Sequence, residues 1–184
     1  MSARAQLLAL LRRSSLQRGD FVLSSGGRSD YYIDGRKSTM SGEGQALIGA
    51  VGLDLLAAAG WEPAAVGGLT LGADPVAYAI ANAASRQGRR LDAFTVRKEP
   101  KGHGAGRQVE GPVRAGQEVV VVEDVLSTGT SALRAIEAIE AFGARVLGVL
   151  ALVDRQMGGP EALAARGYRL VSACTAEELL APEV

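Results

Sequence analysis

The chain has 184 residues, a length that suits one domain with a core large enough to fold without disulfides. Twenty basic residues balance twenty acidic ones, so the overall charge indicates neither a nucleic acid nor an anionic membrane as a partner. Cys174 is the one cysteine and His103 the one histidine, which excludes an internal disulfide and a structural zinc site of the Cys/His type. No apolar stretch forms a signal-peptide core or approaches the ~20 residues of a membrane span, so we expect a cytoplasmic protein.

The N-terminal third predicts a helix, a hairpin and a second helix. Apolar residues at near-helical spacing over 5–16 predict a short amphipathic helix that ends by Gly19. Residues 21–34 alternate between apolar and polar around two central glycines, which indicates a β-hairpin. A serine at the start of 41–59 can cap a helix there, and Gly60 can end it.

The middle of the chain predicts strands and helices in alternation. A short apolar strand over 64–70 precedes a helix over 75–87, whose proline suits a first helical turn, and a strand over 91–97 follows. Repeated glycines and prolines remove any regular period from 98–116. A loop of that length in a compact domain is usually functional or disordered.

The last third predicts a buried parallel strand and its crossover helix. The strand 118–123 contains four consecutive valines, and an unbroken apolar run fits a parallel strand covered on both faces. The remaining predicted elements are a helix ending at Gly143, a strand over 146–153, a short helix over 160–167, a strand over 168–173 and a helical turn over 175–180. The order strand, helix, strand predicts a right-handed crossover. We therefore expect an α/β fold, a mostly parallel twisted sheet flanked by helices with an N-terminal hairpin, as a single domain over 1–184.

The segment that leaves the four valines, Glu123–Ser131, reads E-D-V-L-S-T-G-T-S. Ligands of open parallel sheets bind at the carboxyl ends of strands, and backbone N–H groups at a helix N-terminus bind phosphate. Gly129 lets the backbone approach the anion, and the neighbouring hydroxyls add donors. Glu123 and Asp124 would accept hydrogen bonds from vicinal hydroxyls or from water on Mg²⁺. The alternative is that the hydroxyl residues are ordinary helix caps and the acids lie in a solvated turn.

Two further segments carry charge in a suggestive pattern. The segment Arg97–Gly104, R-K-E-P-K-G-H-G, could close over a pyrophosphate leaving group and neutralise it, although a solvated basic loop is the simpler alternative. Arg155 follows a predicted strand and could hold a carboxylate through two hydrogen bonds. The alternative is an ordinary surface arginine paired with Asp154.

The run V-V-V-V-E-D-V-L-S-T-G-T-S resembles the phosphoribosyl pyrophosphate (PRPP) motif of the type I phosphoribosyltransferases. The loop R-K-E-x-K-x-H-G, the run D-R-Q and the hairpin F-V-L-S-S-G-G-R-S-D-Y-Y-I-D are similar to those of the orotate-specific members. This resemblance covers the chain from about Gly19 to Gln156. It implies transfer of the phosphoribosyl group of PRPP to orotate in de novo pyrimidine biosynthesis, with orotidine 5-monophosphate and pyrophosphate as products.

The resemblance also implies a role for each matching residue. Lys101 and Asp124 would be the catalytic residues, residues 69–74 a second pyrophosphate loop, and about 1–40 a hood over the site. Orotate would contact Ser127, Arg155 and Tyr32. The PRPP-binding residues would be Arg97, Lys98, Lys101, His103, Glu123, Asp124, Val125, Leu126, Ser127, Thr128, Gly129, Thr130 and Ser131. The resemblance further implies a homodimer that shares the basic loop across its interface, and Mg²⁺ held mainly by PRPP and water.

The chain departs from the family pattern at two positions. Many bacterial members have lysines where this chain has Ser24 and Gly72, so Arg28, Lys37 or the basic loop would have to replace their charge. Two other functions fit the PRPP motif. A purine or uracil phosphoribosyltransferase would not need the arginine or this basic loop, and a PRPP-sensing regulator would be expected to carry a basic nucleic-acid-binding region.

Overall fold

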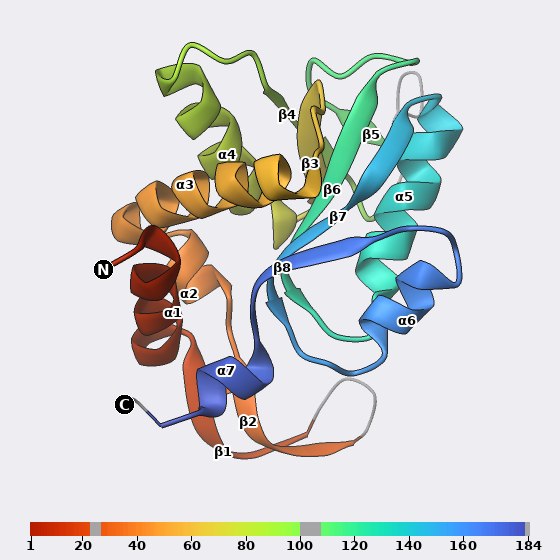
Figure 1. The fold of residues 1–184 in the computed structure, drawn as a ribbon. Helices are drawn as coiled ribbons and strands as arrows, with labels where there is room; N and C mark the ends of the chain where they lie inside the picture. The colour runs from red at the N-terminus through yellow and green to blue at the C-terminus, as the bar shows by residue number, and fades with distance from the viewer. Residues whose placement is uncertain (23–26, 100–107, 183–184) are drawn as a thin grey trace.

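The computed structural model describes residues 1–22, 27–99 and 108–182 (Figure 1). Its helices are α1 (Ala3–Ser14), α2 (Arg36–Thr39), α3 (Gly42–Ala59), α4 (Ala73–Arg86), α5 (Thr130–Phe142), α6 (Gly159–Ala164) and α7 (Ala176–Leu180). Its strands are β1 (Leu16–Val22), β2 (Arg28–Ile33), β3 (Ala65–Leu69), β4 (Asp92–Val96), β5 (Val109–Glu110), β6 (Glu118–Leu126), β7 (Arg145–Asp154) and β8 (Leu170–Thr175). None of the helices within these ranges is both long and apolar enough to cross a membrane.

Six strands form one twisted sheet in the order β5-β4-β3-β6-β7-β8, and β1 and β2 form a separate antiparallel hairpin. The short β5 runs antiparallel to β4, whereas the other neighbours in the large sheet are parallel. The chain moves outward from β3 to β4 and then returns to place β6 on the other side of β3. The strand order therefore reverses between β3 and β6, which is where open α/β sheets bind their ligands.

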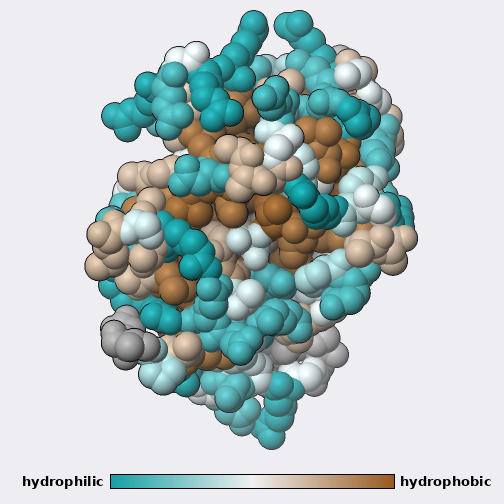
Figure 2. Space-filling model, in the orientation of Figure 1, coloured by the Kyte–Doolittle hydropathy of each residue, from teal (hydrophilic) through white to brown (hydrophobic). Residues whose placement is uncertain are grey.

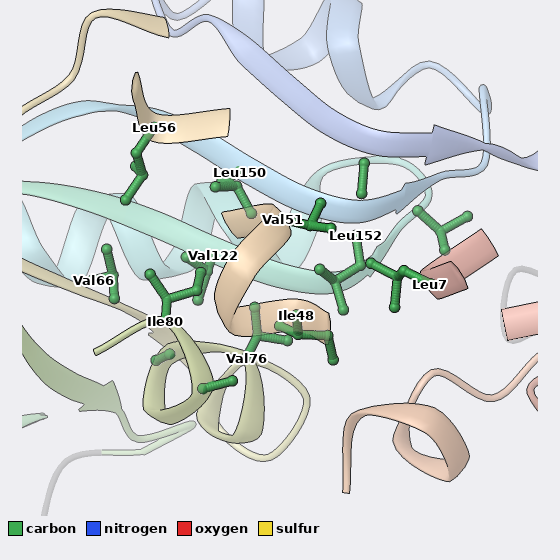
Figure 3. Packing of buried hydrophobic residues seen from close by; sticks show 14 of the residues in the cluster. Leu7, Ile48, Val51, Leu56, Val66, Val76, Ile80, Val122, Leu150 and Leu152 are labelled. Atoms are coloured by element: carbon green, nitrogen blue, oxygen red, sulfur yellow. The ribbon is translucent and has the colours of Figure 1, made fainter. Parts of the chain in front are cut away.

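Helices cover both faces of this sheet, as the sequence predicted. Helices α1, α3 and α4 lie on one side, and α5 and α6 lie on the other (Figure 1). The valines of β6 alternate between the two layers, so that Val120 and Val122 pack with α3 and α4 while Val119 and Val121 pack with α5. Figure 3 shows the first layer, in which Ile48, Val76 and their neighbours point toward Val122.

The outer surface is more polar than these two layers. On the face shown in Figure 2, apolar side chains show mainly in the middle, near α3 and the strands, and polar side chains predominate over the hairpin and around the rim.

Local capping signals determine where helix α3 begins and ends. The Ser41 hydroxyl accepts a hydrogen bond from the Gly44 N–H at 3.0 Å, and Gly60 ends α3 in the left-handed conformation with φ +71°. Both ends of α3 confirm the prediction.

Other boundaries differ from the prediction. The first helix ends at Ser14, and Gly19 lies within β1 instead of ending that helix. Strand β6 continues three residues beyond Glu123, because Val125 and Leu126 pair with the end of β7. Glu123 and Asp124 therefore lie inside a strand and do not follow it. The sequence did not predict α2 or β5, each of which is short.

Candidate active site

A cleft of about 740 Å³ opens at the carboxyl ends of β3 and β6, where the strand order reverses. The hairpin and the residues after it line one wall, and the loop after β3 lines another. The floor consists of the end of β6 and the first residues of α5, and the residues that follow β7 complete the site. Nine of the residues predicted to bind a ligand line this cleft: Tyr32, Lys98, Glu123, Asp124, Val125, Ser127, Thr128, Ser131 and Arg155.

The acid pair on β6 lies in a poorly solvated part of the cleft. Glu123 is 6% exposed, and its buried Oε1 has no hydrogen-bond partner among the described residues. Burial and, to a smaller extent, the charge of Asp124 raise the pKa of Glu123 to about 8. Burial also raises the pKa of Asp124, although the hydrogen bond from the Val125 N–H at 2.9 Å and the charge of Arg36 act in the opposite direction. The alternative of a solvated acidic turn is therefore wrong.

Two glycines from separate segments approach the Asp124 carboxylate. A Cβ atom at Gly72 would lie 2.5 Å from Oδ1 of Asp124, and one at Gly35 would lie 2.7 Å from Oδ2. Both distances are shorter than a real carbon–oxygen contact, so a side chain at either position would displace the carboxylate. A lysine at the position of Gly72 would therefore require the Asp124 carboxylate to move from its place in this arrangement.

The hydroxyl-rich run forms a second hollow of about 380 Å³ beside the cleft. Its lining includes the remaining predicted phosphate residues, Leu126, Gly129 and Thr130, together with most of their neighbours in 123–132. Gly129 is the N-cap of α5 with φ +79°, and no side chain caps this helix. The alternative that the hydroxyls serve as ordinary caps is therefore wrong. The free N–H groups at the start of α5 are available to an anion.

Arg155 is held in the cleft by contacts that leave part of its guanidinium unpaired. It is 9% exposed, and its buried Nε has no hydrogen-bond partner among the residues that the structure describes. The guanidinium lies 4.9 Å from the centre of the Tyr31 ring, within the range of a cation–π contact. Asp154 is also buried, and its Oδ1 accepts a hydrogen bond from the Gln156 N–H at 2.8 Å. The alternative of a surface arginine beside Asp154 is therefore wrong.

The predicted basic loop is described only at its start. Lys98 lines the main cleft, whereas Arg97 lines a neighbouring pocket and lies 3.9 Å from Glu110. Lys101 and His103 lie outside the described residues. The predicted second pyrophosphate loop does line the cleft, through residues 69–72.

Sequence reasoning missed several residues that shape the site. Asp74 was predicted only as the last residue of the second pyrophosphate loop, but it is buried at the start of α4 and accepts hydrogen bonds from the hydroxyls of Thr70, at 2.6 Å, and Thr95, at 2.8 Å. This network joins the loop after β3 to the end of β4. Tyr31 and Arg36 were also missed. Tyr31 belongs to a strand with ordinary alternation of apolar and polar residues, and Arg36 lies in the run D-G-R-K, and neither pattern by itself indicates a binding site.

Comparison with known proteins agrees with this geometry. Residues 46–166 match the Phosphoribosyl transferase domain family. The chain is 50% identical over 175 residues to the orotate phosphoribosyltransferase of Rhodopirellula baltica, covering 93% of this chain and 91% of the relative. It is 45% identical over 183 residues to that of Aquifex aeolicus, covering 98% and 99%. The chain belongs to the orotate phosphoribosyltransferase family.

A solved member of this family is similar over almost the whole chain. The Mycobacterium tuberculosis orotate phosphoribosyltransferase in complex with PRPP has a TM-score of 0.82 and 44% identity, covering 97% of this chain and 99% of that one. The resemblance that the motifs predicted is therefore confirmed, and so is the type I phosphoribosyltransferase fold.

Proposed function

We propose that this chain transfers the phosphoribosyl group of PRPP to orotate and releases pyrophosphate, in the synthesis of pyrimidine nucleotides. The observation that carries the proposal is the buried guanidinium of Arg155, whose Nε has no hydrogen-bond partner in the described parts of the chain and which lies in the same cleft as the acid pair and the hydroxyl-rich run. Such an arrangement suits two anionic ligands that must lie side by side. A cytoplasmic location is consistent with a buried, unpaired Cys174.

The two sides of the ribose find complementary partners. The N-terminus of α5 and the hydroxyls of Ser127–Ser131 suit the 5-phosphate, because backbone N–H groups and the helix dipole favour an anion there. The charge of Asp124 would repel a phosphate, but the carboxyl oxygens of Glu123 and Asp124 can accept hydrogen bonds from the vicinal ribose hydroxyls. Oε1 of Glu123 has no partner in the described structure, so a ribose hydroxyl would satisfy it.

Arg155 suits the carboxylate that distinguishes orotate from uracil. A planar guanidinium can donate two parallel hydrogen bonds to a carboxylate, and burial strengthens this charge-assisted pair. The Tyr31 ring covers one face of the guanidinium, so the ligand must approach along the donor edge. Tyr32 lies in the cleft beside the aromatic ring of Phe21, at 5.7 Å between ring centres, and supplies an apolar surface for the orotate ring.

The chemistry requires positioning and charge neutralisation and no covalent nucleophile. N1 of orotate forms a bond to C1 of the ribose as the bond from C1 to the pyrophosphate oxygen breaks, through a transition state with oxocarbenium character. The proton of N1 leaves to solvent or to the departing pyrophosphate. Holding the two ligands in one cleft makes this step effectively unimolecular. Asp124 would fix the ribose, and Lys98, Lys101 and His103 would neutralise the leaving pyrophosphate.

The residues of the cleft fit Mg²⁺ only through water or PRPP. Within the described parts of the chain, no group of three or more His, Cys, Asp or Glu side chains could hold a metal ion. Glu123 and Asp124 offer two carboxylates, and the unpartnered Oε1 of Glu123 can accept from a metal-bound water. The ion, when bound with PRPP, would spread the charge of the pyrophosphate.

A substrate comparison with one matched variant tests the proposal. PRPP consumption is measured with orotate, uracil, hypoxanthine and adenine in parallel, and orotate is the expected substrate. Arg155→Leu removes a buried charge-assisted pair of about 1.5–3 kcal/mol, so the KM for orotate should rise by roughly 10-fold to 150-fold while the KM for PRPP changes less. Arg114→Leu is the control, because Arg114 is exposed in the turn before β6. Equal activity with uracil, or an unchanged orotate KM in Arg155→Leu, would contradict the proposal.

We also propose a homodimer in which each basic loop acts in the partner's cleft. Leu71 and Tyr78 are each 52% exposed near the cleft, and large apolar side chains of this kind often mark an interface. Homodimers of Lys101→Ala and of Asp124→Asn should both be nearly inactive. A mixed dimer should regain one intact site, because one chain supplies the loop and the other the cleft. Coexpression that restores no activity would show that the loop acts within its own subunit.

A further inference from the structure

The residue after β2, Asp34, and the first residue of α2, Arg36, carry a pair of opposite charges into the cleft. Nε of Arg36 donates a hydrogen bond to Oδ1 of Asp34 at 3.0 Å, and both residues line the cleft. The Arg36 side chain is 49% exposed, so its guanidinium can meet a ligand, while that of Asp34 is more buried. Asp34 therefore restrains, through Nε, an arginine that lines the open cleft.

The acidic and basic side chains that line the cleft indicate a role for Arg36 in binding an anion. The described acids that line the cleft are Asp34, Glu123 and Asp124, and the described cations are Arg36, Lys98 and Arg155. Arg155 is buried under the hairpin beside Tyr31, at the position proposed for orotate. A ligand with several negative charges that binds beside Asp124 needs a cation close to that carboxylate. Arg36 directly follows Gly35, whose Cβ position lies 2.7 Å from Oδ2 of Asp124, and Arg36 and Asp124 line the same cleft.

The structure also separates Arg36 from the other candidates for this charge. Arg28 forms an ion pair with Asp20 at 3.1 Å on the exposed side of the hairpin, and both residues line a different pocket. Lys37 is exposed and is not part of the cleft lining. Gly72 has no side chain and supplies no charge, and a side chain there would displace the Asp124 carboxylate.

We propose that Arg36 binds the pyrophosphate group of PRPP, and that Asp34 holds the guanidinium in place for that contact. The proposal rests on the proposed function, since it assigns a residue to one group of the PRPP molecule. The pyrophosphate is attached to C1 of the ribose, next to the hydroxyls assigned to the acid pair. A cation beside Asp124 would therefore contact the pyrophosphate and would lie away from the 5-phosphate at α5.

The test compares Arg36→Gln with Lys37→Gln, which removes the same charge from the next residue. Calorimetry measures the binding of Mg²⁺-pyrophosphate and, separately, of orotidine 5-monophosphate, which has the ribose and the 5-phosphate but no pyrophosphate. In Arg36→Gln the affinity for pyrophosphate should fall about tenfold, with a similar rise in the KM for PRPP, because the pair is partly exposed and screened. Binding of orotidine 5-monophosphate should change less than threefold, on the order of an ordinary surface effect. Lys37→Gln should change neither, and Asp34→Asn should weaken pyrophosphate binding by a smaller factor than Arg36→Gln.

Three results would overturn the proposal. If Arg36→Gln bound pyrophosphate as well as the parent does, Arg36 would not contact the pyrophosphate group. Equal losses for pyrophosphate and orotidine 5-monophosphate would show that Arg36 acts only through the charge of Asp124. An equal effect in Lys37→Gln would reduce the role to general attraction of anions. A parent protein that binds neither ligand would reject the proposed function itself, whereas an active parent with an unaffected Arg36→Gln would reject the role of Arg36 alone.

Discussion

Glu123→Gln should make the ligand-free protein more stable, by an amount that depends on pH. Burial and the charge of Asp124 raise the pKa of Glu123 from 4.5 to about 8 in the folded protein. Below pH 4.5 the side chain is protonated in both the folded and the unfolded states. Between pH 4.5 and about 8 the unfolded chain releases this proton and the folded chain keeps it, so the folded state loses stability as the pH rises. Glutamine has the same shape and carries no charge, and it removes this loss.

The size of the effect follows from the pKa difference. Each pH unit between the two pKa values corresponds to about 1.4 kcal/mol. The difference in the free energy of unfolding between Glu123→Gln and the parent should therefore be near zero at pH 4.5, about 3 kcal/mol at pH 7, and about 5 kcal/mol above pH 8. A change of 3 kcal/mol in a chain of this length corresponds to a rise in Tm of roughly 6–12 °C.

Thermal unfolding followed by circular dichroism between pH 5 and pH 9 measures this difference. The Tm of Glu123→Gln should separate progressively from that of the parent as the pH rises, and the separation should level off above pH 8. Glu62→Gln is the control, because Glu62 is exposed between α3 and β3, and its curve should follow the parent's. A constant Tm difference across the range, or a Glu123→Gln protein less stable than the parent at pH 8, would refute the electrostatic reasoning.

Three other substitutions separate the parts of the site. Asp124→Asn should raise the KM for PRPP strongly and leave the fold intact, as steady-state kinetics and circular dichroism can check. Gly72→Ala places a Cβ 2.5 Å from the Asp124 carboxylate and should impair PRPP use in the same way, whereas Gly42→Ala, with open space around its Cβ, should not. Tyr31→Leu removes the ring beside Arg155 and should raise the KM for orotate several-fold, on the scale of the about 1 kcal/mol of a cation–π contact. Tyr31→Phe keeps the ring and should behave like the parent, so equal effects of the two Tyr31 substitutions would exclude this role.

Features coded by adjacent residues were predictable from the sequence. Ser41 and Gly60 delimit α3 because a hydroxyl cap and a left-handed glycine act within one helical turn. The four valines predicted a strand buried on both faces, and all four are fully buried. The run Glu123–Ser131 predicted a loop that leads from a strand into a helix, and it extends from the end of β6 to the first residues of α5. This was predictable because the run is contiguous in the chain.

Features that depend on distant partners were not predictable in the same way. Strand β6 continues through Glu123 and Asp124 because β7 pairs with it, and no local signal shows that pairing. The sequence assigned Tyr32 to the cleft but did not show that Tyr31, on the other side of the strand, covers Arg155. The contact between Gly35, Gly72 and Asp124 joins three segments that are far apart in the chain. Spacing within one segment cannot show this contact.

The unpartnered atoms of the cleft explain how one site can select for two ligands together. Among the residues that the structure describes, Oε1 of Glu123 and Nε of Arg155 are buried without hydrogen-bond partners, and each such atom costs free energy in the ligand-free protein. A ribose hydroxyl can satisfy the first and an orotate carboxylate the second, so neither ligand alone removes both costs. Arg155 carries a charge, and a buried charge without a partner costs more free energy than a buried neutral polar group without one. When a base without a carboxylate binds together with PRPP, the Arg155 guanidinium stays without an anionic partner. This free-energy penalty favours orotate over uracil, even though the two rings have the same shape.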